Sequence, residues 1–127
     1  MHEQDLAIVR GLVPLAWADG TYADREKEMI DALLDAYGAS DAEKKLLRDY
    51  AATKRTLDDV NVQDLSADDR RVLMQHAVLL SFADGDQSAD EVKFIEALAK
   101  KLRIPDDETK TIMAAGAERA KKYLKLL

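Results

Sequence analysis

Two short acidic segments hold the side chains of this sequence that are best suited to chemistry. In each, Ala-Asp-Gly is followed by a glutamate seven residues after the aspartate. The candidate residues are Asp19, Asp24 and Glu26 in the first segment, and Asp84, Asp86 and Glu91 in the second. Carboxylate oxygens are preferred ligands of hard cations, and a chain without cysteine is poorly suited to zinc. The pattern therefore predicts a candidate site for Ca²⁺ or Mg²⁺.

The second segment does not fit the calcium loop of an EF-hand. If Asp84 and Asp86 were the third and fifth ligands, Phe82 would stand in the place of the first ligand. Gln87 would replace the turn glycine, and Lys93 would replace the closing bidentate glutamate. We therefore exclude the EF-hand.

A structural role explains the same carboxylates without any ligand. An aspartate before a glycine bonds nearby backbone N–H groups in a tight turn, as expected of Asp19 and Asp84. A glutamate in the first turn of a helix bonds free N–H groups and interacts favourably with the helix dipole, as expected of Glu26 and Glu91. The sequence leaves capping and cation binding as alternatives.

The two acidic segments belong to an internal repeat with an offset of 65 residues. When residues 13–45 are aligned with 78–110, 12 of the 33 positions are identical, including Ala-Asp-Gly and the following glutamate. Two copies are too few for a solenoid. The repeat predicts one domain, residues 1–127, built from two similar helical halves with approximate two-fold symmetry.

The elements that position these segments are predicted to be helices. Apolar residues recur at helical spacing, which predicts an all-α bundle of six to seven helices. The expected main helices span residues 4–18, 23–37, 41–54, 67–84, 89–102 and 106–124, and a connector at about 55–65 joins the halves. Serines at 40, 66 and 88, each followed three residues later by an acidic residue, predict capping boxes. Gly20, Gly38 and Gly85 are expected to end helices in the left-handed conformation.

Several side chains are assigned to the core by the same periodicity. The apolar faces include Leu33, Leu46 and Leu98, and Trp17 and Phe82 are expected to be equivalent core anchors. Two polar or irregular positions complete the prediction. His76 is interpreted as a hydrogen-bonded histidine at the core boundary, and Pro14 is expected to kink or shorten the first helix.

Composition excludes several classes of function. The formal charge of −6 and the pI of about 4.9 argue against nucleic-acid binding. The longest nearly apolar run, residues 77–83, is far shorter than the roughly 20 residues of a membrane span. The acidic start of the chain does not resemble a signal peptide, so we expect a cytoplasmic protein. No phosphate loop, nucleophile elbow or paired-histidine helix is present, so an enzyme is not expected.

The duplicated Ala-Asp-Gly and glutamate, followed in both copies by a helical core stripe, resemble the tellurite-resistance TerB-like family. The resemblance covers about residues 6–117, and the family includes the N-terminal domain of DjlA co-chaperones. It implies an all-helical bacterial protein linked to tellurite and stress resistance, non-enzymatic and acting through protein partners. The family's acidic positions would be Asp19 with Glu26, and Asp84 with Glu91, where a divalent cation is implied. The chain has neither the transmembrane helix nor the J-domain of the co-chaperones. The alternative function is a metal-free helical adaptor for protein interaction, a co-chaperone-like module.

Overall fold

Six α-helices and two short 3₁₀-helices make up the described part of the chain, which contains no strand. The computed structural model describes residues 2–18, 20, 24–82 and 87–124, with side chains to residue 122. The elements are α1 (Glu3–Ala16), α2 (Asp24–Ala36), α3 (Asp41–Ala51), η1 (Leu57–Asp59), η2 (Val62–Asp64), α4 (Ala67–Ser81), α5 (Ala89–Lys101) and α6 (Asp106–Leu124). The prediction of a single all-α domain is confirmed.

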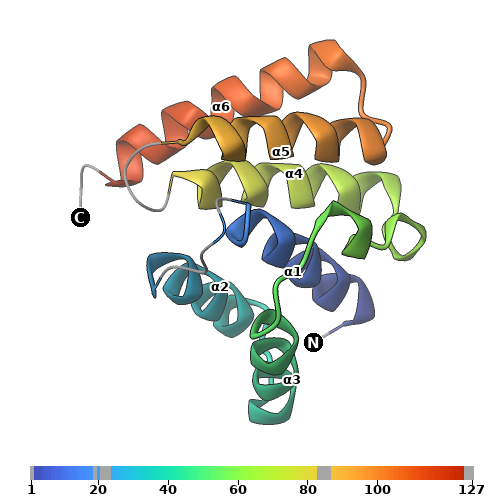
Figure 1. The fold of residues 1–127 in the computed structure, drawn as a ribbon, viewed down its shortest axis with the longest axis vertical. Coiled ribbons are helices and arrows are strands. Elements are labelled where there is room, and N and C mark those ends of the chain that lie inside the picture. Colours follow the sequence, from blue (N-terminus) through green and yellow to red (C-terminus); the bar gives the residue numbers. More distant parts are fainter. Residues whose placement is uncertain (1, 19, 21–23, 83–86, 125–127) are drawn as a thin grey trace.

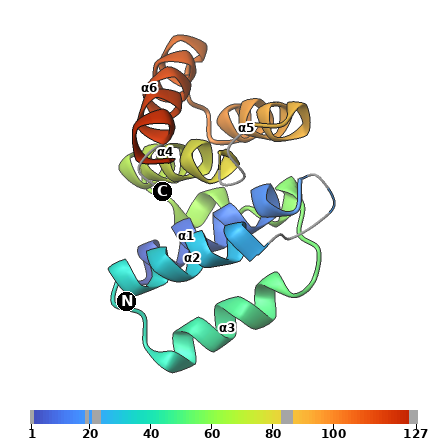
Figure 2. The same cartoon turned by 90° about the vertical axis from the view of Figure 1, so that its left-hand side faces the viewer.

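Helices α1 and α4 lie against each other in the middle of the molecule (Figure 1). Helices α2 and α3 lie on the far side of α1, and α5 and α6 lie on the far side of α4. Figure 2 shows the same order from the side. Helix α1 buries residues around most of its circumference, because it has neighbours on several sides, whereas the fully buried residues of α4 lie on one broad face.

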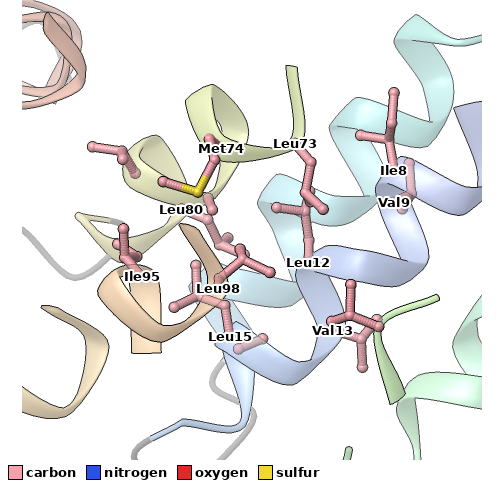
Figure 3. Packing of buried hydrophobic residues seen from close by; sticks show 14 of the residues in the cluster. Ile8, Val9, Leu12, Val13, Leu15, Leu73, Met74, Leu80, Ile95 and Leu98 are labelled. Atoms are coloured by element: carbon pink, nitrogen blue, oxygen red, sulfur yellow. The ribbon is translucent and has the colours of Figure 1, made fainter. Parts of the chain in front are cut away.

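The core lies mainly between α1 and α4 and extends to α5. Figure 3 shows the side chains of Leu12, Leu15, Leu73, Met74 and Leu98 meeting there. All five are at most 2% exposed. Burying a large aliphatic side chain stabilises a fold by roughly 1.5–3 kcal/mol, so this cluster is the main source of stability.

The three predicted capping boxes are all present. Ser40, Ser66 and Ser88 each precede a helix, and each side chain accepts a hydrogen bond from the backbone N–H three residues later. In each box the acidic side chain three residues later accepts a hydrogen bond from the serine N–H in return. Two of the otherwise free N–H groups at each of these helix starts are thereby satisfied.

Left-handed residues occur where two of the glycines were predicted to end helices. Gly20 has a φ of 92° and Gly38 a φ of 75°. Gly85 lies outside the described residues. Arg103, which is 65 residues after Gly38, has a φ of 60°. The residues after Gly38 and Arg103 donate to Leu34 and Ala99, so the same C-terminal motif closes α2 and α5.

The helix ends follow the offset of the sequence repeat. Helices α2 and α5 begin and end 65 residues apart, α1 and α4 end 65 residues apart, and α3 and α6 begin 65 residues apart. Helix α6 has 19 residues and α3 has 11, so the halves differ most in their third helix. A two-fold relation between the halves stays a prediction.

The connector between the halves is held mainly by two basic side chains. Arg70 donates to the carbonyl oxygens of Val62, Leu65 and Leu102 at 3.1, 3.2 and 3.3 Å. Lys101 donates to the carbonyl oxygen of Leu57 at 2.7 Å. Val60 and Leu65 of the connector are each 4% exposed. Leu57, which is partly buried, also packs against the core.

Some details of the prediction were wrong. Leu46 is 59% exposed, because its neighbour Leu47 is the residue of α3 that faces the core. Leu33 is only partly buried, and Leu34 is the fully buried residue of that turn. Adjacent leucines fit a helical stripe almost equally well in sequence, so the rotation of each helix about its own axis decides which of the two faces the core.

The first helix is shorter than predicted, but Pro14 is not needed to explain its end. Helix α1 ends at Ala16 and not at residue 18. Helix α4 has Leu79 in the position of Pro14, and it ends at the equivalent residue, Ser81. The common end indicates that Pro14 is not what stops helix α1.

Candidate functional site

The structure describes three of the six predicted carboxylates. Asp24 and Glu26 lie in the first turn of α2, and Glu91 lies in the first turn of α5. The exposed fractions of Glu26 and Glu91 are 2% and 7%, which is unusual for carboxylates. Asp19, Asp84 and Asp86 lie outside the described residues. The two buried glutamates are equivalent in the repeat.

The capping interpretation is confirmed for Glu91. Its Oε1 accepts a hydrogen bond from the N–H of Ser88 at 3.0 Å, and its own N–H donates to Oγ of Ser88 at 3.1 Å. This arrangement satisfies free N–H groups at the start of α5 and places the negative charge at the positive end of the helix dipole. Glu91 therefore has a structural role that requires no ligand.

Glu26 takes the same helix position, but its sequence context differs. The residue equivalent to Ser88 is Ala23, whose side chain has no hydroxyl with which to complete a reciprocal box. The two carboxylates are thus nearly buried at equivalent helix positions, but only Glu91 has a serine, Ser88, with which to form a capping box.

The described residues do not form a metal site by themselves. Within the described ranges, no group of three or more histidine or acidic residues is close enough to hold a metal ion. Asp24 is exposed and lies 3.9 Å from the ammonium of Lys27, a spacing typical of a weak surface pair. A cation site at either Asp-Gly segment would need ligands among Asp19, Asp84 and Asp86, which lie outside the described residues.

Trp17 and Phe82 both lie at the core boundary, as predicted for equivalent anchors. The indole N–H of Trp17 donates to the carbonyl oxygen of Ala51 at 3.0 Å. Ala51 is the last residue of α3, where carbonyl oxygens lack helical partners. The indole therefore connects the ends of α1 and α3 in addition to filling the core.

His76 is the hydrogen-bonded boundary histidine that the sequence predicted. Its Nε2 lies 3.1 Å from Oη of Tyr37, and the two rings meet edge to face with centroids 6.3 Å apart. Burial lowers the pKa of His76, and the positive charge of Arg119 lowers it further. A neutral imidazole is favoured at this contact between the two halves.

Sequence reasoning missed a groove beside α1. The groove has a volume of about 580 Å³ and is formed by α1, the last turn of α3 and the connector. Leu6 and Ala7 of α1 and the ring of Tyr50 contribute apolar surface to it. Glu3 and Asp64 are among the acidic residues along it. These residues are far apart in sequence, and no motif connects them.

Comparisons with known protein families, with curated proteins and with solved structures found no match to this chain. The part of the chain that the structure describes contains no helix with the length and apolar character of a bilayer span.

Proposed function

We propose that this chain is a TerB-like, non-enzymatic protein that acts through protein partners in bacterial resistance to tellurite and related stress. The observation that supports the proposal best is the repeat of helix bounds at an offset of 65 residues. Glu26 and Glu91 are equivalent in this repeat and nearly buried, and each lies seven residues in sequence after the aspartate of an Asp-Gly segment, the pattern that carries the resemblance to this family.

An approximate two-fold axis between the halves is part of this proposal. The shared ends of α2 and α5, closed by the same C-terminal motif at Gly38 and Arg103, support it. Superposition of residues 13–45 on 78–110 in an experimental structure would test it. Segments that superpose no better than unrelated helical hairpins would contradict the axis.

The biological part of the proposal can be tested in the source bacterium. Deletion of the gene should lower tolerance to potassium tellurite, and a plasmid copy of the wild-type gene should restore it. A copy with Leu98→Ala, which should destabilise the fold, should restore tolerance less well. Unchanged tolerance to tellurite and to oxidative stress in the deletion strain would refute the proposed role.

Cation binding at the Asp-Gly segments is a separate part of the proposal. Crowded carboxylates repel one another, and a bound cation would offset that repulsion. A cation that binds only the folded state would raise the Tm. Titration calorimetry and thermal unfolding with Ca²⁺ and Mg²⁺ should show binding that Asp84→Asn abolishes.

The metal-free adaptor is the second candidate, and the capping box of Glu91 favours it. It predicts no heat of binding at millimolar Ca²⁺ or Mg²⁺ and no increase in Tm. In that case Asp84→Asn should leave the tellurite tolerance of the complemented strain unchanged. The calorimetry therefore separates the two candidates without knowledge of the partner.

A further inference from the structure

The groove beside α1 joins an open helix face to an acidic rim. Leu6, Ala7 and Gly11 of α1 lie along it, and Leu6 and Ala7 are only partly buried. Its volume of about 580 Å³ falls within the range of about 300–1,000 Å³ that is usual for ligand sites. The groove can therefore receive side chains and short lengths of backbone.

The groove carries more acidic than basic side chains. Glu3, Asp59 and Asp64 lie along it, and Arg10 is its only basic residue among those described. Asp59 accepts a hydrogen bond from the N–H of Thr56 at 2.7 Å. Within the described part of the chain, none of the three carboxylates forms an ion pair.

The charge of the surrounding sequence has the same sign. Residues 1–65 carry 14 acidic and 8 basic side chains, a net charge of −6, whereas residues 66–127 carry 11 of each. A concave surface of one charge sign focuses the field and raises the local concentration of oppositely charged groups. The groove thus attracts cations and repels acidic partners.

Tyr50 provides an aromatic surface suited to a guanidinium group. The guanidinium carbon of Arg55 lies 3.9 Å from the centroid of the Tyr50 ring, and that of Arg10 lies 5.7 Å from it. Both distances are within the range of cation–π attraction. Arg10 is exposed and lines the groove, so a partner's arginine would reach this ring by displacing the Arg10 guanidinium.

We propose that this groove binds a basic, arginine-containing peptide segment of a protein partner. The carboxylates of Glu3, Asp59 and Asp64 would pair with its basic side chains, and Leu6 and Ala7 would contact its aliphatic parts. The inference rests on the proposed function, because it specifies the chemistry of the partner. It is independent of cation binding at the Asp-Gly segments.

The test uses the full chain and a fluorescein-labelled peptide of alternating glycine and arginine, with a glycine–glutamate peptide as the charge control. Fluorescence anisotropy should show saturable binding of the arginine peptide alone. Calorimetry should give one peptide per chain. Binding should weaken as the salt concentration rises from about 0.1 to 0.5 M, because salt screens charges at the rim.

A matched pair of double variants separates the groove from general acidity. Glu3→Gln with Asp64→Asn removes two charges from the groove. Asp68→Asn with Asp107→Asn removes two exposed charges from the first turns of α4 and α6, outside the groove. Since exposed ion pairs each contribute modestly, we expect Kd to rise about 5- to 20-fold in the groove variant and less than about 2-fold in the control.

Equal weakening in both variants, or no saturable binding, would overturn the proposal. Concentration-dependent self-association that the groove variant abolishes, without peptide binding, would also overturn it and would assign the groove to a second copy of the chain. Circular dichroism and Tm should confirm that both variants are folded. If peptide binding fails while the deletion strain is tellurite-sensitive, the proposed function stands and only this groove assignment fails.

Discussion

Leu33 and Leu98 offer a sharp test of the packing, because they are equivalent in the repeat but differ in burial. Leu98 is fully buried on α5, whereas Leu33 on α2 is only partly buried and packs against the edge of the core. Truncation of either residue to alanine removes the same atoms from the same helix position. A difference between the two variants therefore reports the surroundings and not the chemistry of the substitution.

The expected magnitudes follow from the cavity that each truncation leaves. Leu98→Ala removes a side chain whose neighbours include Leu15 and Ile95, as Figure 3 shows, and it should cost about 3–5 kcal/mol. Leu33→Ala should cost about 1–2 kcal/mol, because solvent and neighbouring side chains can fill most of the space. A domain of this size has a free energy of unfolding of about 5–15 kcal/mol, so the first variant approaches the limit of folding.

Urea unfolding followed by circular dichroism, and by fluorescence of the single tryptophan, Trp17, would measure both values. Coincident transitions from the two probes and an unchanged m value would justify a two-state interpretation. Leu34→Ala, at the fully buried neighbour of Leu33, serves as a positive control and should cost about 2–4 kcal/mol. Equal losses in Leu33→Ala and Leu98→Ala would refute the assignment of the buried face of α2.

Four further predictions follow from single contacts. Arg70→Ala removes three hydrogen bonds to carbonyl oxygens and should lower the free energy of unfolding by about 1–3 kcal/mol. Arg70→Lys should recover less than half of this loss, and urea unfolding measures both variants. Because the pKa of His76 is lowered in the folded protein, the unfolded chain binds a proton at His76 more readily as the pH falls, so stability should decrease below about pH 6.5. Thermal melts of His76→Gln should show a smaller decrease over the same pH range. Gly116→Ala would place a Cβ against Cγ1 of Val78, closer than the two atoms can lie, and should cost about 1–3 kcal/mol despite better helix propensity. Val78→Ala should partly rescue this variant in chemical denaturation. Arg103→Gly should raise stability by up to about 1 kcal/mol, because the left-handed φ of 60° is unfavourable for arginine; a lower Tm would show that the arginine side chain compensates for its backbone.

The local features of the helices could be predicted from the sequence because neighbouring residues determine them. A serine and an acidic residue three positions apart satisfy the same N–H groups in almost any protein, so the boxes at Ser40, Ser66 and Ser88 were predictable. The same is true of Gly38, since only a residue that tolerates positive φ fits the turn after α2. Arg103 was not predictable, because arginine itself disfavours the positive φ that this turn requires.

The candidate carboxylates were identified by sequence, but their environment was not. Spacing placed Glu26 and Glu91 at helix starts, where the structure has them. It did not reveal that both side chains are nearly buried, because burial depends on which neighbouring elements cover the helix start. Whether Asp19, Asp84 and Asp86 converge with them stays a prediction.

The sequence by itself determined the helical class, the six helices with ends accurate to within three residues, and the helix caps, all of which depend on contacts a few residues apart. Tertiary structure alone decided which leucine of an adjacent pair faces the core, as with Leu33 and Leu34 or Leu46 and Leu47. It also decided that Glu3, Tyr50 and Asp64 line one groove. The physical reason is that such contacts join residues far apart in sequence, so they depend on how whole helices are oriented when they bury apolar surface against one another.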